Sequence, residues 1–297
     1  MRETLCQRLG SVVAAVATIA AGCGPGSPSA PAGAAGSVPR VVSLAPALTA
    51  IVTALGAKGA LVGVTAYCDA PGVPVVGDFK PQPERVLAQR PDRVLLADYG
   101  SQGADREALA ALGLNVSVLP LQTLADMRKT TLAIGGLLRR EGEARGLVAE
   151  FDRVADGVRA RAVAHRTTAG AHPVRVLLVY DLEPGFVLTT GGGDHVSELF
   201  ALAGADNVAA GAPRTARLGL EVVLARQPDL IVHAARDQRF ADDAAARAYW
   251  REAFPALPAV QRGQVYVWPD DLLARNGPHL AVVLARVAAM VDGARAP

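Results

Sequence analysis

Two segments of this chain, far apart in sequence, carry the same pattern of residues. They are PERVLAQRPDRVLL at 83–96 and LEVVLARQPDLIVH at 220–233, and each holds Glu, Val, Leu, Ala, Pro and Asp at the same places. Each predicts a short helix opened by a carboxylate, then a Pro-Asp turn and a buried strand. A second pair, ALTAIVTALGA at 47–57 and HVSELFALAGA at 195–205, predicts two apolar helices ended by Gly-Ala. Any two strand–helix units share some likeness, but the two ordered pairs favour a chain built of two related lobes.

Between the copies lies a charged run, from Glu141 to His165, with the period of an amphipathic helix. Arginines and carboxylates surround one apolar stripe, formed by Leu147, Phe151, Val154 and Val158. A helix of this length is roughly 37 Å long, enough to hold two lobes at a fixed separation. Thr123 and Asp126 resemble a capping box, which predicts a preceding helix that ends near Leu138.

Length and composition fit a folded protein with ample cores. The chain has 297 residues, of which 51% are hydrophobic, and a formal net charge of only +2. No basic run is present, so the electrostatic signature of a nucleic-acid-binding protein is missing.

The N-terminus has the pattern of an export signal. Residues 1–22 combine two early arginines with a short apolar stretch and end in Ala-Ala-Gly before Cys23. This ending is similar to the box at which bacterial lipoproteins are lipidated on cysteine; an ordinary signal peptide that ends near a cysteine is the alternative. Residues 23–39 are rich in Gly, Pro, Ser and Ala, which predicts a flexible tether. We expect an N-terminal lobe at 40–122, a helical linker at 123–172 and a C-terminal lobe at 173–297.

Polar and aromatic residues follow several of the predicted strands. Tyr67, Cys68 and Asp69 come directly after the strand at 61–65, while Phe79 and Tyr99 stand near the ends of neighbouring segments. Ligands of open α/β sheets bind at the carboxyl ends of strands, so these side chains predict a ligand rim. Half-buried aromatics at a sheet edge and, for Cys68, a buried small hydrophobe are the alternatives.

In the second half, three glycines precede His195 at the start of a predicted helix. A phosphate or carboxylate cradle and a plain turn are both compatible with them, and the spacing matches neither nucleotide-binding loop pattern. The loop at 270–277, which holds Arg275, is expected to face the first lobe's rim.

Catalytic constellations are not apparent. The sequence contains no GxSxG, HExxH or Cys-x-x-Cys motif, and its five histidines are dispersed. We therefore expect no enzyme, no resident cofactor and no dedicated metal site.

Taken together, the lipoprotein box at the N-terminus and the ordered motifs from Arg40 to Val291 resemble the iron-siderophore and cobalamin class of ABC-transporter solute-binding proteins. They are the lipoprotein box, SLAPALTAIVTALGA, VGVTAYCDAP, the PERVLAQRPDRVLL and LEVVLARQPDLIVH pair, TTGGGDHVSELFALAGADNVAAG and ARNGPHL. The resemblance implies an α/β fold of two Rossmann-like lobes joined by one long rigid helix, with the ligand in the cleft between the lobes.

The resemblance also implies partners. In this family a surface glutamate on each lobe pairs with arginines of the membrane permease, and the matching residues here are Glu84 and Glu221. First-turn acids favoured by the helix dipole are the alternative explanation. A monomeric, lipid-anchored protein that works with a permease and its ATPase, at the periplasmic or outer cell surface, is what the resemblance predicts.

The ligand that the resemblance implies is a metal chelate, most simply cobalamin or another corrinoid. Cleft positions of the family fall at or near Tyr67, Phe79, Tyr99, Phe186 and Arg275. The tryptophan that cobalamin binders often place before the second docking glutamate is absent, and Arg214 and Arg217 there suit an anionic ferric siderophore. A haem would require an axial ligand, for which Tyr67 and His195 are the candidates, while direct metal ligation by Cys68 and Asp69 lacks further ligands.

Overall fold

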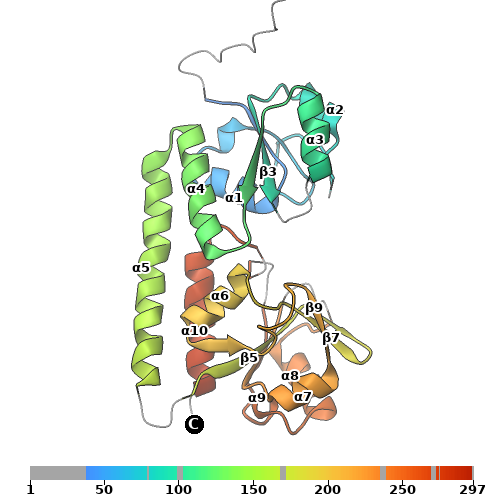
Figure 1. Cartoon of the computed structure of the whole chain (residues 1–297), viewed down its shortest axis with the longest axis vertical. Coiled ribbons are helices and arrows are strands. Elements are labelled where there is room, and N and C mark those ends of the chain that lie inside the picture. The colour runs from blue at the N-terminus through green and yellow to red at the C-terminus, as the bar shows by residue number, and fades with distance from the viewer. Residues whose placement is uncertain are drawn as a thin grey trace, which may run out of the picture. The chain divides into compact units, whose positions relative to one another are not determined.

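The computed structural model describes residues 38–78, 80–98, 103–167, 172–234, 239–268, 272–273 and 275–295. Within these residues the chain is an α/β protein with two parallel sheets and one small antiparallel sheet (Figure 1). Each parallel sheet has its own helices and its own hydrophobic clusters, and we call the two halves the N-terminal and the C-terminal lobe.

The N-terminal lobe is built on a four-stranded parallel sheet in the order β2-β1-β3-β4. Its central strands are short apolar runs, as expected of strands covered on both faces, and Val41, Val42, Val94 and Leu95 are completely buried. The strands are β1 Val41–Ser43, β2 Leu61–Val64, β3 Arg93–Asp98 and β4 Val116–Pro120. The helices are α1 Pro46–Ala54, the 3₁₀ turn η1 Lys58–Ala60, α2 Pro83–Ala88 and α3 Gly103–Ala111.

The C-terminal lobe repeats this plan with a parallel sheet in the order β11-β10-β5-β8. Its strands are β5 Val174–Val179, β8 Ala205–Asn207, β10 Leu230–His233 and β11 Val265–Val267. Its helices are α6 His195–Leu202, α7 Leu220–Arg226, α8 Asp243–Ala253, α9 Pro258–Gln261 and α10 Leu280–Arg295.

An antiparallel sheet extends the C-terminal lobe. It consists of β6 Asp181–Glu183, β7 Phe186–Thr189 and β9 Ala216–Gly219, in the order β6-β7-β9. Gly185, at a φ of +83°, makes the tight turn between β6 and β7, a backbone conformation that suits glycine. Strand β9 leads directly into α7, so the turn lies beside the start of that helix.

Two helices connect the lobes. Helix α4 Leu124–Leu138 begins with the predicted capping box, in which Thr123 and Asp126 each bond the other's backbone N–H. Helix α5 Glu141–Arg166 is the predicted long helix, and Figure 1 shows it running first beside α4 and then beside α10. Its residue Ala144 packs in the N-terminal core, whereas Phe151 and Val158 pack in the C-terminal core, so one helix stabilises both. Nowhere in the described ranges is a helix long and apolar enough to span a membrane.

The sequence repeat is also a structural repeat. Arg90 and Gln227 occupy equivalent places after α2 and α7, and both adopt the left-handed backbone conformation, with φ of 47° and 48°. The aspartates two residues later each accept a backbone N–H at the start of the first strand of their lobe: Asp92 from Arg40, just before β1, and Asp229 from Arg175, the second residue of β5. The predicted two-lobed duplication is therefore confirmed at the level of individual hydrogen bonds.

Candidate functional site

The carboxyl edges of the two sheets are tied to each other by hydrogen bonds between distant segments. Asn276, in the loop after β11, donates from Nδ2 to the carbonyl oxygens of Leu121 at 2.9 Å and Thr123 at 3.0 Å, just after β4. At the start of α6, the backbone N–H of His195 donates to Gln122 at 2.9 Å. Parallel strands bind ligands at their carboxyl ends, so this junction brings the binding edges of both sheets together.

On the N-terminal side, Tyr67, Cys68 and Asp69 follow β2, as predicted. Tyr67 is 50% exposed and Asp69 is exposed, so both are accessible at the sheet edge. Cys68 is only partly exposed, and its Sγ lies 3.1 Å from the hydroxyl of Thr49 and 3.2 Å from that of Thr65. The thiol is thus held against the lobe by two hydroxyl groups.

These two threonines belong to a hydroxyl cluster that the sequence reasoning missed. Thr49 also donates to the hydroxyl of buried Ser43 at 2.8 Å, at the end of β1. The available signal was three small hydroxyl residues at the ends of the first two strands and the start of the first helix. Two further predicted rim residues, Phe79 and Tyr99, and the predicted lipidation site Cys23 lie outside the described residues.

His195 lies inside the junction. It is 8% exposed, and its Nε2 donates to the carbonyl of Leu273 at 3.2 Å. Burial lowers the pKa of His195 below its ordinary value of 6.5, and the carboxylate of Asp194 opposes this only in part. His279, just before α10, similarly donates to the carbonyls of Leu272 and Arg275. Both imidazoles therefore serve to hold the loop that carries Arg275 and Asn276.

The remaining predicted residues of the C-terminal lobe lie at different places. Arg217 forms an ion pair with Glu183 across the antiparallel sheet at 3.0 Å, so an anionic ligand would have to compete with this carboxylate. Phe186 is 46% exposed and pairs with Gly219, two residues before Glu221. It therefore lies beside the start of α7. Arg275 is partly buried next to Asn276 in the junction loop.

The glycines before α6 are explained by close packing. A Cβ on Gly191 would lie 2.0 Å from the carbonyl oxygen of Ala212, and one on Gly192 would lie 2.6 Å from that of Ala210. The N-terminus of α6 is already capped by Asp194, which accepts the backbone N–H of Ser197 at 2.9 Å. Of the two readings of this loop, the geometry favours the turn, because carbonyl oxygens and a carboxylate surround it.

Glu84 and Glu221 occupy equivalent first-turn positions in α2 and α7. Both are exposed, and neither carboxylate has a hydrogen-bond or ion-pair partner among the described residues. Many other surface acids of the chain are paired, for example Glu150 with Arg153 and Asp156 with Arg159. Two unpaired carboxylates at matching positions are thus available to an external partner.

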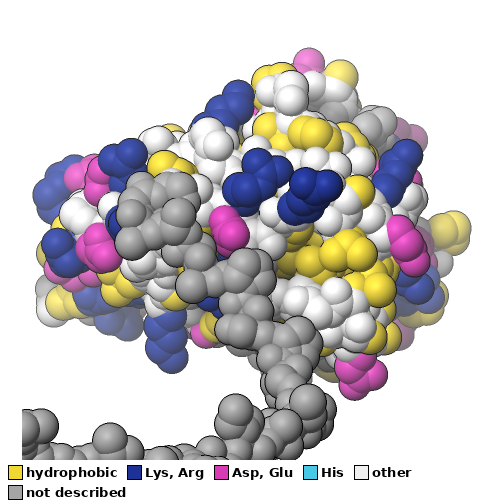
Figure 2. Space-filling view, turned by 90° about the horizontal axis from the view of Figure 1, so that it is seen from above, with side chains coloured by type: hydrophobic (Ala, Val, Ile, Leu, Met, Phe, Trp, Pro, Cys, Tyr) yellow, Lys and Arg dark blue, Asp and Glu magenta, His cyan; other side chains and the backbone are white. Residues whose placement is uncertain are grey.

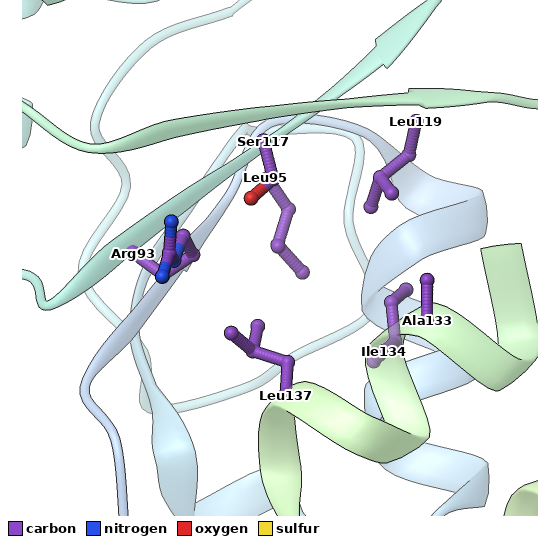
Figure 3. A pocket seen from close by; sticks show the side chains of 7 residues that line it. All are labelled: Arg93, Leu95, Ser117, Leu119, Ala133, Ile134 and Leu137. Atoms are coloured by element: carbon purple, nitrogen blue, oxygen red, sulfur yellow. The ribbon is translucent and has the colours of Figure 1, made fainter.

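Two cavities lie within single lobes. One, of about 270 Å³, lies between the sheet of the N-terminal lobe and α4, where Leu137 and Ile134 face Leu95 (Figure 3). It is lined by Arg93, Leu95, Ser117, Leu119, Ala133, Ile134 and Leu137. The other, of about 220 Å³, is lined by Val208, Ala209, Gly211, Ala212, Leu218, Val222 and Arg226. Both are smaller than typical small-molecule sites of about 300–1,000 Å³, and neither includes a predicted ligand residue.

The described side chains contain no group of three or more His, Cys, Asp or Glu residues placed to hold a metal ion. On the face of the molecule that Figure 2 shows, basic and acidic side chains are interspersed with hydrophobic ones.

Comparison with known proteins agrees with this architecture. The vitamin B12-binding protein of Pectobacterium atrosepticum is 26% identical over 256 residues, which cover 83% of this chain and 86% of that protein. The uncharacterized ABC transporter substrate-binding lipoprotein YvrC of Bacillus subtilis is 28% identical over 249 residues, 81% of this chain and 76% of that protein.

Solved structures share the fold. The periplasmic haem-binding protein BhuT, in complex with two haems, has a TM-score of 0.74 at 24% identity, covering 87% of this chain and 99% of that one. The periplasmic vitamin B12-binding protein BtuF of Vibrio cholerae has a TM-score of 0.73 at 24% identity, covering 87% and 98%. The family model described as periplasmic binding protein matches residues 41–272, and the chain therefore belongs to the periplasmic binding protein family.

Proposed function

We propose that this protein is the solute-binding component of an ABC importer and that it carries a corrinoid of the vitamin B12 class. The observation that carries the proposal is the junction at Asn276, which joins the carboxyl edges of the two parallel sheets. A ligand bound at this place contacts both lobes at once. The vitamin B12-binding protein that covers most of the chain supports the ligand class.

Aromatic rings at the predicted rim fit a broad, flat ligand. Tyr67 stands half exposed at the edge of the N-terminal sheet, and Phe79 and Tyr99 belong to the same predicted rim. Aromatic rings contribute large contact areas to flat ligands at a small cost in conformational entropy. In the N-terminal lobe we assign ligand contact to these three rings and to Cys68 and Asp69, which follow Tyr67. In the C-terminal lobe, across the proposed cleft, the more distant candidates for ligand contact are Phe186, His195, Arg217 and Arg275.

Delivery to the permease is assigned to Glu84 and Glu221. Their equivalent, exposed and unpaired positions support two-point docking, in which charge complementarity sets orientation and encounter rate. The protein acts in this proposal as a monomer and without catalysis of its own.

Lipidation of Cys23 would tether the protein to the membrane, outside the cytoplasm, through the Gly- and Pro-rich segment that follows. The substrate-binding lipoprotein YvrC of Bacillus subtilis supports this arrangement.

A haem is the second candidate ligand, favoured by the structural similarity to haem-binding BhuT. In that case Tyr67 is the accessible residue able to serve as an axial ligand. His195 is a poor axial ligand, since its Nε2 is already engaged with Leu273.

Isothermal calorimetry and thermal unfolding with cyanocobalamin, cobinamide, haem and ferric siderophores test the ligand assignment. When the free corrinoid concentration is about a thousand times its dissociation constant, binding should raise the free energy of unfolding by about 4 kcal/mol. A haem-only response, with a Soret band shifted in the Tyr67→Phe variant, would establish the second candidate. If none of the chelates gives a binding heat or a thermal shift, the carrier proposal is refuted.

The docking assignment has its own test. The double variant Glu84→Lys, Glu221→Lys should stop uptake of the bound ligand in cells while the purified protein keeps its affinity within a few fold. Normal uptake by this variant would contradict the docking role.

A further inference from the structure

The two copies of the repeat share few residues, and the structure explains most of them. Val86 and Val223 are buried and anchor α2 and α7 to their lobes. The shared aspartates bond the backbone at the start of the first strand of each lobe, through Arg40 in one and Arg175 in the other. The shared Pro-Asp turns follow a left-handed residue in both copies. These positions are required by the fold.

Two further shared residues have no such role in the fold. Leu87 and Leu224 lie three residues after Glu84 and Glu221, and they remain 44% and 38% exposed. Residues three apart on a helix lie on the same face, so each leucine stands beside an unpaired carboxylate. A large exposed apolar side chain gains little from folding, and here the same one recurs at the same place in both lobes.

We propose that each lobe docks on the permease through a two-part contact, in which the carboxylate is joined by the leucine one turn later. This proposal rests on the proposed function. The permease should then present, at two places, a basic side chain next to an apolar depression. The two components have different tasks. The carboxylates of Glu84 and Glu221 raise the rate of encounter with the permease through charge attraction. The side chains of Leu87 and Leu224 become buried in the contact, which slows dissociation of the complex.

Because the two components have different tasks, substitutions of the leucines and of the glutamates should change different rate constants. In Leu87→Ala and Leu224→Ala, the dissociation rate should rise by about fivefold each, since part of a leucine's burial is lost. The association rate and its dependence on salt should stay as in the parent protein. In Glu84→Gln and Glu221→Gln, the association rate should fall and its salt dependence should weaken.

Leu132 provides a matched control. It is 44% exposed, equal to Leu87, but it lies on α4 and has no counterpart in the repeat. Leu132→Ala should leave both rate constants unchanged. Circular dichroism and ligand calorimetry verify that each variant is folded and binds its ligand.

The experiment uses the full-length, host-processed protein and membrane vesicles that contain the ABC permeases of the source cell, with binding followed by surface plasmon resonance at several salt concentrations. A photo-crosslinking residue in place of Leu87 or Leu224 should give a product that mass spectrometry identifies as an ABC permease subunit, and one in place of Leu132 should not.

The outcomes are distinguishable. If the leucine variants dissociate like Leu132→Ala while Glu84→Lys, Glu221→Lys abolishes docking, the leucine contact is refuted and the proposed function stands. If the charge-reversed variant also docks normally, the proposed docking surface itself is wrong. Faster dissociation of both leucine variants with unchanged salt dependence supports the two-part contact.

Discussion

Arg175 encloses the carboxylate of Asp229 with three donors: its backbone N–H at 3.0 Å, Nε at 2.8 Å and Nη2 at 3.1 Å. Arg262 adds a fourth at 2.6 Å. Asp229 is almost fully buried, while the two arginines remain partly exposed. Burial by itself raises the pKa of Asp229, but the hydrogen bonds from Arg175 and Arg262 outweigh it and hold the pKa below its usual 3.8.

Replacing Asp229 should therefore destabilise the C-terminal lobe. In Asp229→Ala the backbone N–H of Arg175 loses its acceptor, and we expect the free energy of unfolding to fall by about 2–3 kcal/mol. This is less than for a fully buried ion pair, because the two arginines are partly exposed. Urea unfolding measures it. Asp156→Asn, which removes an exposed ion pair on α5, should change the free energy of unfolding by less than about 0.5 kcal/mol.

The same carboxylate predicts that the protein loses stability at acidic pH. A depressed pKa means that the stabilisation is complete above the unfolded value of 3.8 and is lost as the pH falls through the lower folded value. Thermal unfolding between pH 5 and pH 2 should thus show a steeper decline for the parent protein than for Asp229→Asn. Equal slopes would show that Asp229 is not linked to folding.

His195 predicts a second pH dependence at milder acidity. Its folded pKa lies below 6.5, so the unfolded chain takes up a proton first as the pH falls, and stability decreases from about pH 6.5 downward by at most about 1.4 kcal/mol per pH unit. His195→Gln should remove this slope. His172→Gln, at an exposed position, should retain it.

The hydrogen bonds of Asn276 predict which substitutions at the junction destabilise the protein more. Its amide donates to two backbone carbonyls, so Asn276→Ala should cost about 1–2 kcal/mol. Asn276→Asp should cost more at neutral pH, because it faces the carbonyl oxygens of Leu121 and Thr123 with an anion. Both should weaken ligand binding if the junction orients the lobes. Denaturation and calorimetry of the two variants decide this, and equal stability of both variants would argue against the donor role.

Tyr67 predicts a ligand effect without a large stability effect. Its ring is half exposed, and Tyr67→Ala should weaken corrinoid binding by about 1–3 kcal/mol if the ring stacks on the ligand. Leu112→Ala, which changes a 38% exposed side chain beyond the last turn of α3, serves as the control. Unchanged affinity in Tyr67→Ala would place the ligand elsewhere.

Much of the fold was accessible from local patterns. The long helix, the capping box at Thr123 and the paired helix–strand segments were predicted within a few residues, because periodicity and capping involve residues that are close in the chain. The same locality explains why Tyr67, Cys68 and Asp69 were found at a strand end.

The contacts around the candidate site were less accessible. The ion pair of Arg217 with Glu183 and the bonds of Cys68 with two threonines join residues from different elements. A single sequence states which side chains are present, and their partners depend on how sheets and helices pack.

The sequence by itself determined the two-lobed duplication and the connecting helix, since both follow from contiguous residues and their spacing, while the surface positions of Glu84 and Glu221 were implied by the family resemblance. Only the tertiary structure decided that Asn276 and His195 join the carboxyl edges of the two sheets at Leu121 to Thr123, and that His195 is thereby buried. Those hydrogen bonds connect residues more than 70 positions apart. Such contacts form only when the packing of both cores brings their segments together, and no local periodicity encodes them.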